Sequence, residues 1–227
     1  MSEPTLLNAD QIAELASIDS PTISNAVDTF GVRDATEGFA SLDLRCIYPE
    51  LPPVVGYAVT CTDDSSTPRK GKGNGYRALY EAIEASPKPV IVVFKSPIDP
   101  KRSLHMGEVM ASMVVGLGAV AVVTDGGVRD IAGVRSSTPH FQMFAAGTVV
   151  AGGAPSLMDV GITVGICGLT ISPGDLLHGD ANGLLTIPHA VAPRVAEVAR
   201  RIQEDEASRI EQTRKPGFSV ADLQAGH

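Results

Sequence analysis

Three side chains suited to catalysis lie near the middle of the chain: Glu108, Arg129 and Asp130. The guanidinium of Arg129 is a planar fork of N–H donors that fits a carboxylate or an enolate oxygen. Asp130, with Glu108 nearby, offers the hard oxygen ligands that Mg²⁺ prefers, and this ion needs few protein carboxylates. These residues predict a site for a small anion beside a divalent cation, provided that the fold brings them together.

A predicted strand–helix–strand unit spans these residues. The segment 88–95 predicts a buried strand, and A-V-A-V-V-T predicts a second one at 119–124. Between them, apolar residues at helical spacing predict a helix from about residue 107 to residue 118. Such units are almost always right-handed parallel crossovers, so we expect both strands to run in the same direction.

This unit places the helix N-terminus and the loop after the second strand at the same end of the sheet. Glu108 and the Arg129–Asp130 pair, with twenty residues between them, should therefore be neighbours in space. In open parallel sheets this is the end where ligands bind. The free N–H groups near Glu108, Val109 and Met110 favour an anion there.

The second strand is expected to end in a glycine turn. Gly126 and Gly127 follow V-V-T-D, and glycines would let the backbone come close to a ligand. A simpler interpretation stays open. Arg129 and Asp130 could form a local surface pair, with Asp130 capping a helix that begins at Ile131.

Composition and charge limit the class of protein. The chain has 227 residues, 44% of them hydrophobic and 19% charged, which predicts a folded protein with a sizeable core. A net charge of -8 without a Lys/Arg run argues against nucleic-acid binding. The three cysteines are far apart, and no apolar run is long enough to span a membrane. We expect a cytoplasmic protein that binds neither nucleic acid nor membrane, with one domain over 1–227 and a C-terminal tail at 215–227.

The rest of the sequence alternates between helix and strand signals, which predicts an α/β fold. Ser20 is a natural N-cap, with Pro21 in the first turn and Gly31 after the helix end. The segment G-K-G-N-G at 71–75 lacks the spacing of a phosphate-binding P-loop, so we interpret the polar stretch 63–75 as a loop. The other predicted elements are helices at 9–17, 76–85 and 189–214, and strands at 52–61, 139–144, 147–151, 162–167 and on both sides of a hairpin turn at 181–183.

Three segments resemble the RraA-like family, which includes class II pyruvate aldolases acting on 4-hydroxy-4-methyl-2-oxoglutarate. The stretch G-E-V-M-A-S-M-V-V-G-L-G-A-V-A-V-V-T-D-G-G-V-R-D at 107–130 is similar to the family pattern of an acidic residue, twenty residues and then Arg-Asp. The segments D-S-P-T-I-S-N-A-V-D at 19–28 and P-G-D-L-L-H-G-D-A-N-G-L-L-T-I-P at 173–188 are also similar. The resemblance thus covers about residues 19 to 200.

The resemblance implies a single-domain α/β/β sandwich of the swivelling-domain-like type. It implies a homotrimer or a dimer of trimers, with active sites between subunits. Asp130 would hold Mg²⁺ or Mn²⁺, and Arg129 would contact the substrate oxygen. The backbone at Gly107, Val109 and Met110 would bind the carboxylate of the pyruvyl group.

The implied activity is cleavage of a 4-hydroxy-2-oxo dicarboxylic acid to pyruvate. A metal and Arg129 would stabilise the pyruvate enolate without a Schiff-base lysine, and Glu108 would position a water as general acid and base. Decarboxylation of oxaloacetate passes through the same enolate. The alternative is a non-catalytic RraA-like regulator of the ribonuclease-inhibitor type, which acts by protein–protein contact. Because such regulators lack the acidic residue, the presence of Glu108 favours the enzyme.

The chain departs from the family pattern around the expected pocket. The loop at 95–103 is not the Gly-rich stretch that precedes the acidic residue in the family, and His105 replaces an apolar or aromatic residue. His105 therefore either contacts substrate or is a solvent-exposed or capping residue. His178, in L-L-H-G-D, is expected to be structural at a strand end.

Overall fold

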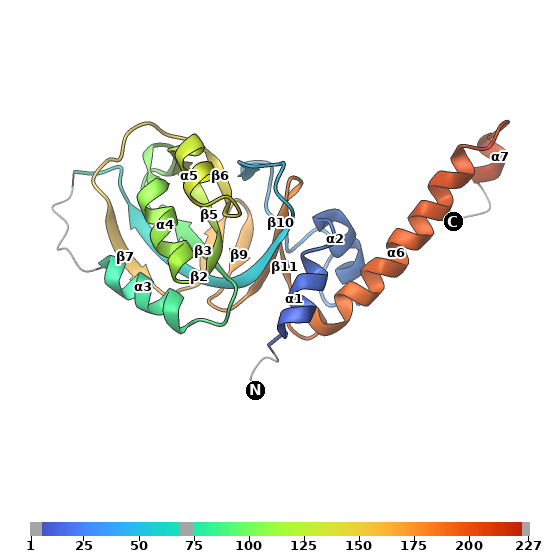
Figure 1. The fold of residues 1–227 in the computed structure, drawn as a ribbon, viewed down its shortest axis with the longest axis horizontal. Helices are drawn as coiled ribbons and strands as arrows, with labels where there is room; N and C mark the ends of the chain where they lie inside the picture. The colour runs from blue at the N-terminus through green and yellow to red at the C-terminus, as the bar shows by residue number, and fades with distance from the viewer. Residues whose placement is uncertain (1–5, 69–74, 224–227) are drawn as a thin grey trace.

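The computed structural model describes residues 6–68 and 75–223. A curved sheet carries helices on one side, and a long C-terminal helix projects away from the body (Figure 1). The strands are β1 (Arg45–Cys46), β2 (Val54–Asp64), β3 (Val90–Lys95), β4 (Leu104–Met106), β5 (Ala119–Val128), β6 (Gln142–Thr148), β7 (Ser156–Val160), β8 (Val164–Ile166), β9 (Leu169–Ile171), β10 (Leu176–Asp180) and β11 (Gly183–Ile187). The helices are α1 (Ala9–Leu15), α2 (Ser20–Asp28), α3 (Gly75–Ala85), η1 (Pro100–Arg102), α4 (Glu108–Gly116), α5 (Ile131–Ser137), α6 (Ala192–Thr213) and α7 (Val220–Leu223).

The large sheet has nine strands around a parallel centre. β6, β5, β3 and β2 lie side by side in that order and run parallel. β10 and β11 continue the sheet beyond β2 in antiparallel fashion, and β1 pairs with β6 at the other edge. The central strands are covered on both faces, which is why β2 and β3 are almost continuously buried.

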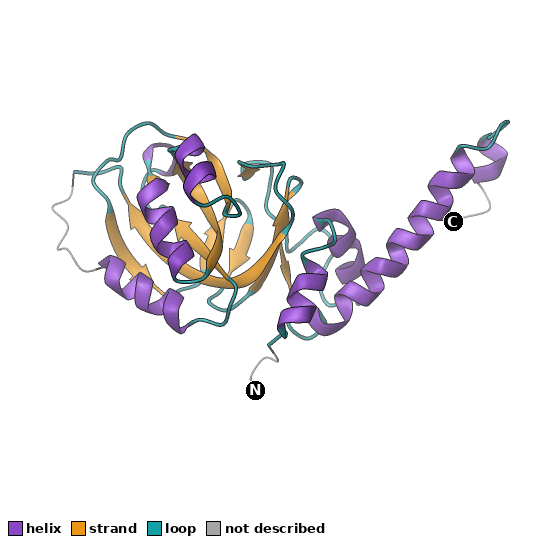
Figure 2. Cartoon of the chain, in the orientation of Figure 1, coloured by secondary structure: helices purple, strands orange, loops and turns teal. Residues whose placement is uncertain are grey.

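Three apolar clusters hold these layers together. The first, around Phe94, lies between the sheet and the helices α3, α4 and α5. The second, around Phe144, lies on the opposite face against β8, β9, β10 and β11. The third, around Tyr57, joins α1, α2 and the start of α6 to β10 and β11. Figure 2 shows helices over the curved sheet, and the cluster around Phe144 packs the separate β8–β9 sheet on its other face, so the predicted α/β/β sandwich is confirmed.

The predicted crossover is also confirmed. β3 and β5 pair in parallel, with Val92 opposite Val122, and α4 lies between them in sequence. The predicted helix after residue 20 is present, but its N-cap is Asp19 and not Ser20. The reason is that the Asp19 carboxylate accepts the N–H of Thr22, which leaves Ser20 inside the first turn.

The glycine turn predicted after Thr124 is wrong. β5 continues to Val128, because Gly127 and Val128 pair with β4 on one side and with β6 on the other. The short strands β4 and β7 were not predicted at all. Two residues of the predicted 63–75 loop, Asp63 and Asp64, are buried in β2 instead.

The structure also bears on the predictions for the 71–75 segment, for the strands at 139–151 and for the C-terminal tail. Of G-K-G-N-G, the residues 71–74 lie outside the described part of the chain, and Gly75 begins α3. The predicted strands at 139–144 and 147–151 are one strand, β6. The region 215–227, predicted as a tail, contains α7. In the described ranges, no helix is both long and apolar enough to cross a bilayer.

Candidate active site

A pocket of about 310 Å³ opens where α4 begins and β5 ends. Its lining includes Glu108, Arg129 and Asp130, the three residues that the sequence spacing predicts to be neighbours. The volume is at the lower end of the range for small-molecule sites. The predicted meeting of the two segments is thus confirmed, and it takes place in a cavity.

Two backbone contacts fix this meeting. The N–H of Arg129 donates to the carbonyl of Met106 at 2.9 Å, continuing the pairing of β4 with β5. One residue further, the N–H of Glu108 donates to Oδ2 of Asp130 at 3.2 Å. The pairing of β4 with β5 therefore places Arg129 and Asp130 beside the first turn of α4, where Glu108 lies.

Asp130 has an unusual backbone conformation. Its φ of 57° and ψ of 39° lie in the left-handed region, which non-glycine residues rarely occupy. Such strain costs about 1–3 kcal/mol and is found most often at functional sites. Asp130 is the N-cap residue of α5, yet its side chain makes no capping hydrogen bond. The capping interpretation is therefore wrong, because the carboxylate reaches toward α4 instead.

Arg129 has donors left for a ligand. Its Nε is buried 3.5 Å from Oδ2 of Asp130 and makes no hydrogen bond to the described residues, and the rest of the guanidinium remains for a ligand. The side chains of the two residues are 41% and 44% exposed. The far end of the guanidinium lies against Gly152, where a Cβ would come within 3.1 Å of Nη1. The pair does form a local ion contact, as the simpler interpretation held, but it lies in the pocket wall.

Two glycines make room for the carboxylates. A Cβ at Gly107 would come within 2.7 Å of Oδ2 of Asp130 and 3.3 Å of Nε of Arg129. A Cβ at Gly133 in α5 would collide with the carboxylate of Glu108. Glycine is needed at both places for close approach, and Glu108 therefore lies over the first turn of α5, close to Asp130.

The first turn of α4 also presents free donors. Gly107 is the N-cap and has no side chain to bond them. The first intrahelical bond is donated by Ala111 to the carbonyl of Gly107, so the N–H groups of Val109 and Met110 have no intrahelical acceptor. Gly107 itself precedes the helix and is part of the pocket lining. This turn can bind an anion.

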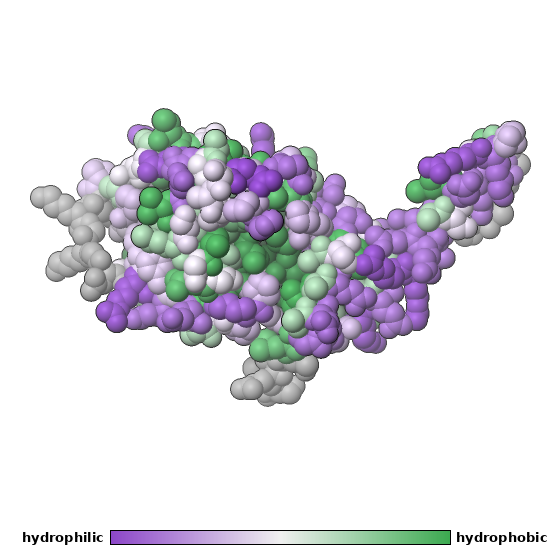
Figure 3. Space-filling view, viewed as in Figure 1, coloured by the Kyte–Doolittle hydropathy of each residue, from purple (hydrophilic) through white to green (hydrophobic). Residues whose placement is uncertain are grey.

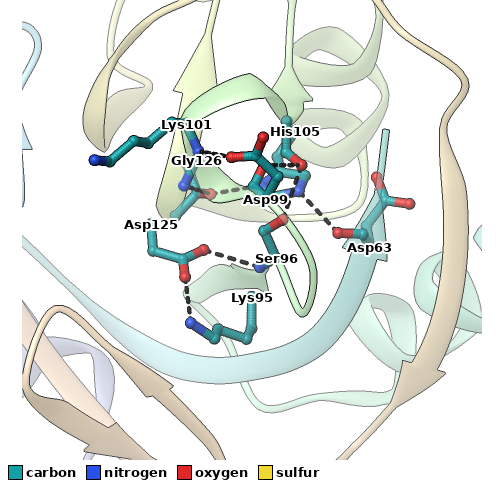
Figure 4. Close-up of polar contacts among 10 residues, drawn as sticks. Asp63, Lys95, Ser96, Asp99, Lys101, His105, Asp125 and Gly126 are labelled. Carbon is teal, nitrogen blue, oxygen red and sulfur yellow. Dashed lines mark hydrogen bonds and ion pairs between the residues drawn. The ribbon is translucent and has the colours of Figure 1, made fainter. Parts of the chain in front are cut away.

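His105 is neither exposed nor a helix cap. It is buried in β4, and its ring stacks on Phe94 at 5.4 Å between centroids. Its Nε2–H donates to the carbonyl of Asp63 at 3.1 Å, while Thr124 Oγ1 donates to Nδ1 and itself accepts the N–H of Gly126 (Figure 4). Burial lowers the pKa of His105. The ring borders the pocket, but both of its nitrogens are already bonded.

The predicted role of Gly126 and Gly127 is wrong as well. A Cβ at Gly126 would come within 2.9 Å of the His105 ring, and one at Gly127 within 2.6 Å of Val149. These glycines accommodate protein side chains rather than a ligand. Nearby, Asp125 ties the end of β3 to β5, because it accepts the N–H of Ser96 at 2.9 Å and pairs with Lys95 (Figure 4).

Sequence reasoning missed Tyr76, a residue of the pocket lining, and its buried partner Asp63. Tyr76 lines the pocket and donates its hydroxyl to Oδ2 of buried Asp63 at 2.9 Å. The other oxygen of Asp63, Oδ1, makes no hydrogen bond of standard geometry to the described residues. Burial raises the pKa of Asp63. The contact joins α3 to β2 across thirteen residues of sequence. The only sequence signal for it was the polar residue Asp63 directly after the apolar run of β2.

His178 lies far from the pocket. It is buried in β10, where it accepts from Ser20 Oγ at 2.9 Å and donates to the carbonyl of Leu15 at 3.0 Å. These bonds fasten α1 and α2 to the sheet. Its structural role agrees with the prediction.

The donor set suits a hard cation with few protein ligands. Among the described residues, no group of three or more His, Cys, Asp or Glu is arranged to hold a metal. A zinc site needs three or four such ligands, whereas Mg²⁺ is commonly held by one or two carboxylates, waters and substrate oxygens. Asp130 offers a half-exposed carboxylate whose Oδ1 accepts no hydrogen bond from the described residues. The residues therefore fit Mg²⁺ or Mn²⁺ better than zinc.

Comparison with known proteins gives a consistent picture. The model of a family described as RraA-like, Aldolase/RraA, matches residues 20–186. A protein of Halalkalibacterium halodurans named "Putative 4-hydroxy-4-methyl-2-oxoglutarate aldolase" is 31% identical over 197 residues. The match covers 86% of this chain and 88% of that protein.

Solved structures share the fold. An uncharacterized protein from Pseudomonas syringae superposes with a TM-score of 0.76 at 22% identity, covering 100% of this chain and 98% of the other. RraAS2 of Streptomyces coelicolor, described as an unusual member of the RNase ES inhibitor RraA protein family, has a TM-score of 0.69 at 20% identity, with 90% and 98% coverage. At these identities the likeness establishes the architecture alone.

Proposed function

The chain belongs to the RraA-like family, and from this premise we propose that it is a divalent-metal-dependent carbon–carbon lyase that releases pyruvate from a 4-hydroxy-2-oxo acid. One observation carries the proposal. Arg129 and Asp130 face the free N–H groups of the first turn of α4 within one pocket. A 2-oxo acid has a carboxylate and an adjacent keto oxygen, and this pocket has donors for both.

Each part of the pyruvyl group has a partner in the pocket. The N–H groups of Val109 and Met110, with the backbone at Gly107, bind the carboxylate. The Arg129 guanidinium donates to the keto oxygen. Asp130 would hold Mg²⁺ or Mn²⁺, and the ion would supply Lewis-acid polarisation of the keto group.

The cleavage is a retro-aldol step. A base removes the proton of the 4-hydroxyl, the C3–C4 bond breaks, and its electron pair enters the pyruvate enolate as the carbonyl product leaves. Arg129 stabilises the enolate oxygen, which carries charge only after the bond begins to break. Glu108 positions the water that takes the hydroxyl proton and later returns a proton to C3. No lysine is present among the described residues that line the pocket, which disfavours a Schiff-base route.

The same site would decarboxylate oxaloacetate. Loss of CO₂ from C4 leaves the same enolate, so it needs no group beyond Arg129, Asp130 and the helix N-terminus. A homotrimer or a dimer of trimers completes the proposal. The outward side of α4 supports assembly, because Val109 is 70% exposed and Met113 50% exposed beside the pocket.

A coupled pyruvate assay tests the proposal. Oxaloacetate and 4-hydroxy-4-methyl-2-oxoglutarate are supplied with Mg²⁺, then with EDTA, to the purified chain and to Arg129→Ala. Pyruvate that depends on both the metal and Arg129 supports a lyase. No pyruvate from either compound would refute it and favour the regulator that acts by protein–protein contact.

A further inference from the structure

The two strands that lead into the pocket are both irregular just before it. In β5 the pairing with β6 shifts between Thr124 and Gly127, where β5 carries an extra residue and forms a β-bulge. In β4 the pairing with β5 shifts at His105. Bulges bend a strand and redirect the side chains that follow, and they are frequent beside active sites. The side chains that follow this bulge are those of Arg129 and Asp130.

A chain of hydrogen bonds joins the two irregularities (Figure 4). Nε2–H of His105 donates to the carbonyl of Asp63 at 3.1 Å, and Nδ1 accepts the hydroxyl proton of Thr124. The same hydroxyl accepts the N–H of Gly126 at 2.8 Å. The ring also packs on Gly126, where a Cβ would come within 2.9 Å of it. His105 therefore connects β2 and β4 to the bulge of β5.

The two ends of this chain of bonds fix its polarity. The carbonyl of Asp63 can only accept a hydrogen bond, and the N–H of Gly126 can only donate one. The His105 ring therefore carries its proton on Nε2, and the Thr124 hydroxyl donates to Nδ1. This arrangement uses every polar group of the chain and keeps the ring neutral. Burial, which lowers the pKa of His105, favours the same neutral form.

The surroundings of these bonds are apolar. The His105 ring stacks on Phe94, and Thr124 is fully buried. The space-filling view shows hydrophobic residues gathered on the face of the body that carries α4, whereas the projecting part of α6 is hydrophilic (Figure 3). In such surroundings a hydrogen bond is stronger than in water and an unpaired polar group is costly. The bonds therefore hold the bulge in one arrangement.

Two backbone hydrogen bonds carry this arrangement to the pocket. The N–H of Gly127 donates to the carbonyl of Ser103 at 2.8 Å, and the N–H of Arg129 donates to the carbonyl of Met106 at 2.9 Å. Both donors follow the bulge in β5, and the two acceptors lie on either side of His105. A movement of the bulge against β4 would therefore move Arg129 relative to the first turn of α4.

We propose that His105 is a positioning residue of this site: its ring, through Thr124, holds the bulge of β5 in the arrangement that places Arg129 beside the first turn of α4. The proposal rests on the proposed function, because Arg129 is the group that stabilises the enolate there. His105 acts through these residues and not by contact with the substrate. Loss of the bond to Thr124 should thus lower kcat and leave KM, which depends on the donors of α4, nearly unchanged.

Two substitutions of similar shape separate positioning from packing. Oδ1 of an asparagine lies where Nδ1 lies in a histidine, so His105→Asn can still accept from Thr124, whereas His105→Leu cannot. With oxaloacetate and Mg²⁺, kcat per folded protein should fall by about 10²-fold in His105→Leu, with KM within about threefold. His105→Asn should keep a kcat at least about tenfold above that of His105→Leu.

A merely structural role predicts the opposite order, because leucine suits a buried apolar site better than asparagine does. A kcat in His105→Leu that equals or exceeds that of His105→Asn overturns the proposal.

Thr124→Val gives an independent readout, because it removes the hydroxyl and keeps the shape. Its kcat should also fall by about 10²-fold. Combined with His105→Leu, the loss should stay near 10²-fold, since both changes break the same chain of bonds, and a loss of about 10⁴-fold would contradict the proposal. The control is Thr60→Val, which removes a buried hydroxyl of β2 outside the pocket lining and should leave kcat unchanged. An equal loss in Thr60→Val would also contradict it.

Failure of this inference and failure of the proposed function give different results. Hydrogen exchange, measured by mass spectrometry on the free protein, follows the segment that contains Gly127 and Arg129. It should be at least about tenfold faster in His105→Leu than in His105→Asn. This difference in a parent that releases no pyruvate removes the lyase proposal alone. Equal kcat in both variants of an active parent removes the inference alone, and an inactive parent with equal exchange removes both.

Discussion

Oδ2 of Asp130 accepts the backbone N–H of Glu108 at 3.2 Å, and this bond joins the strained start of α5 to the first turn of α4. The bond holds the Asp130 carboxylate on the side of the pocket, away from the end of its own helix. This bond uses the backbone N–H of Glu108, so the N–H groups of Val109 and Met110 remain for a ligand. The geometry of the site therefore depends on the distance between the N-termini of α4 and α5.

Gly107→Ala should disable the site without unfolding the protein. The new Cβ would come within 2.7 Å of Oδ2 of Asp130, and a displacement of about 1 Å can cost about 10²-fold in rate. Alanine accepts the backbone at this position, where φ is −143°. Gly116→Ala, where nothing lies within 4 Å, is the control in the same helix. Equal kcat for pyruvate release in Gly107→Ala and Gly116→Ala would contradict the expectation.

Arg129→Ala should lower kcat by about 10²–10³-fold, as expected for loss of an oxyanion donor. The matched control is Arg135→Ala in α5, whose partly exposed guanidinium pairs with Glu50 outside the pocket. Steady-state kinetics with oxaloacetate and Mg²⁺ measure the effect. A loss of similar size in both variants would indicate a general disturbance of α5 instead.

At this site, the sequence predicted which segments lie close together better than it predicted which side chains are in contact. The twenty-residue spacing between Glu108 and Arg129 sufficed, because a parallel crossover brings its helix start and strand end to one side of the sheet. The role of Gly126 and Gly127 was not predictable, since glycine is as compatible with a turn as with a strand that accommodates a bulky neighbour. The neighbour of Gly126, the His105 ring, comes from a three-residue strand too short to show any periodicity.

The pair formed by Asp63 and Tyr76 shows a second limit of prediction from the sequence. The polar residues of 63–75 predict a loop, yet Asp63 is fully buried, because β2 continues past the end of the apolar run. Its partner is in the next helix, and no local pattern encodes a bond between them. The layers were predictable from hydrophobic patterning, whereas buried polar contacts between layers required the three-dimensional structure.

Tyr76→Phe should reduce the free energy of unfolding by about 1–3 kcal/mol. The substitution removes the hydroxyl that donates to buried Asp63, whose other oxygen makes no hydrogen bond of standard geometry to the described residues. Tyr80→Phe, which loses a long contact with a methionine sulfur, is the control and should change stability much less. Urea unfolding followed by circular dichroism gives both values. A Tyr76→Phe protein as stable as the parent would show that Asp63 does not need this donor.

The free energy of unfolding should fall as pH is lowered below about 6.5, the ordinary pKa of histidine. Burial lowers the pKa of His105 and of His178 in the folded state, so the unfolded chain takes up these protons first. The stabilisation is complete above the unfolded value and is lost as pH falls toward the lowered values, by up to about 1.4 kcal/mol per pH unit for each histidine. Asp63, whose pKa burial raises in the folded state, contributes with the opposite sign.

Urea unfolding at pH 7.5, 6.5 and 5.5 measures this dependence. His178→Gln should reduce the slope between pH 6.5 and pH 5.5, even if the variant is less stable overall. His140→Gln changes an exposed histidine and should leave the slope as it is. Constant stability of the parent over this range would contradict the assignment of buried, neutral histidines.

Deuterium exchange of the pyruvate methyl group tests the central claim most directly. The protein is incubated in D₂O with pyruvate and Mg²⁺, and the methyl proton signal is followed by NMR. If the pocket at α4, Arg129 and Asp130 stabilises the pyruvate enolate, the signal decays with the parent chain but not with EDTA, Arg129→Ala or Asp130→Asn. A signal that persists with the parent, or decays equally with Arg129→Ala, would contradict the account.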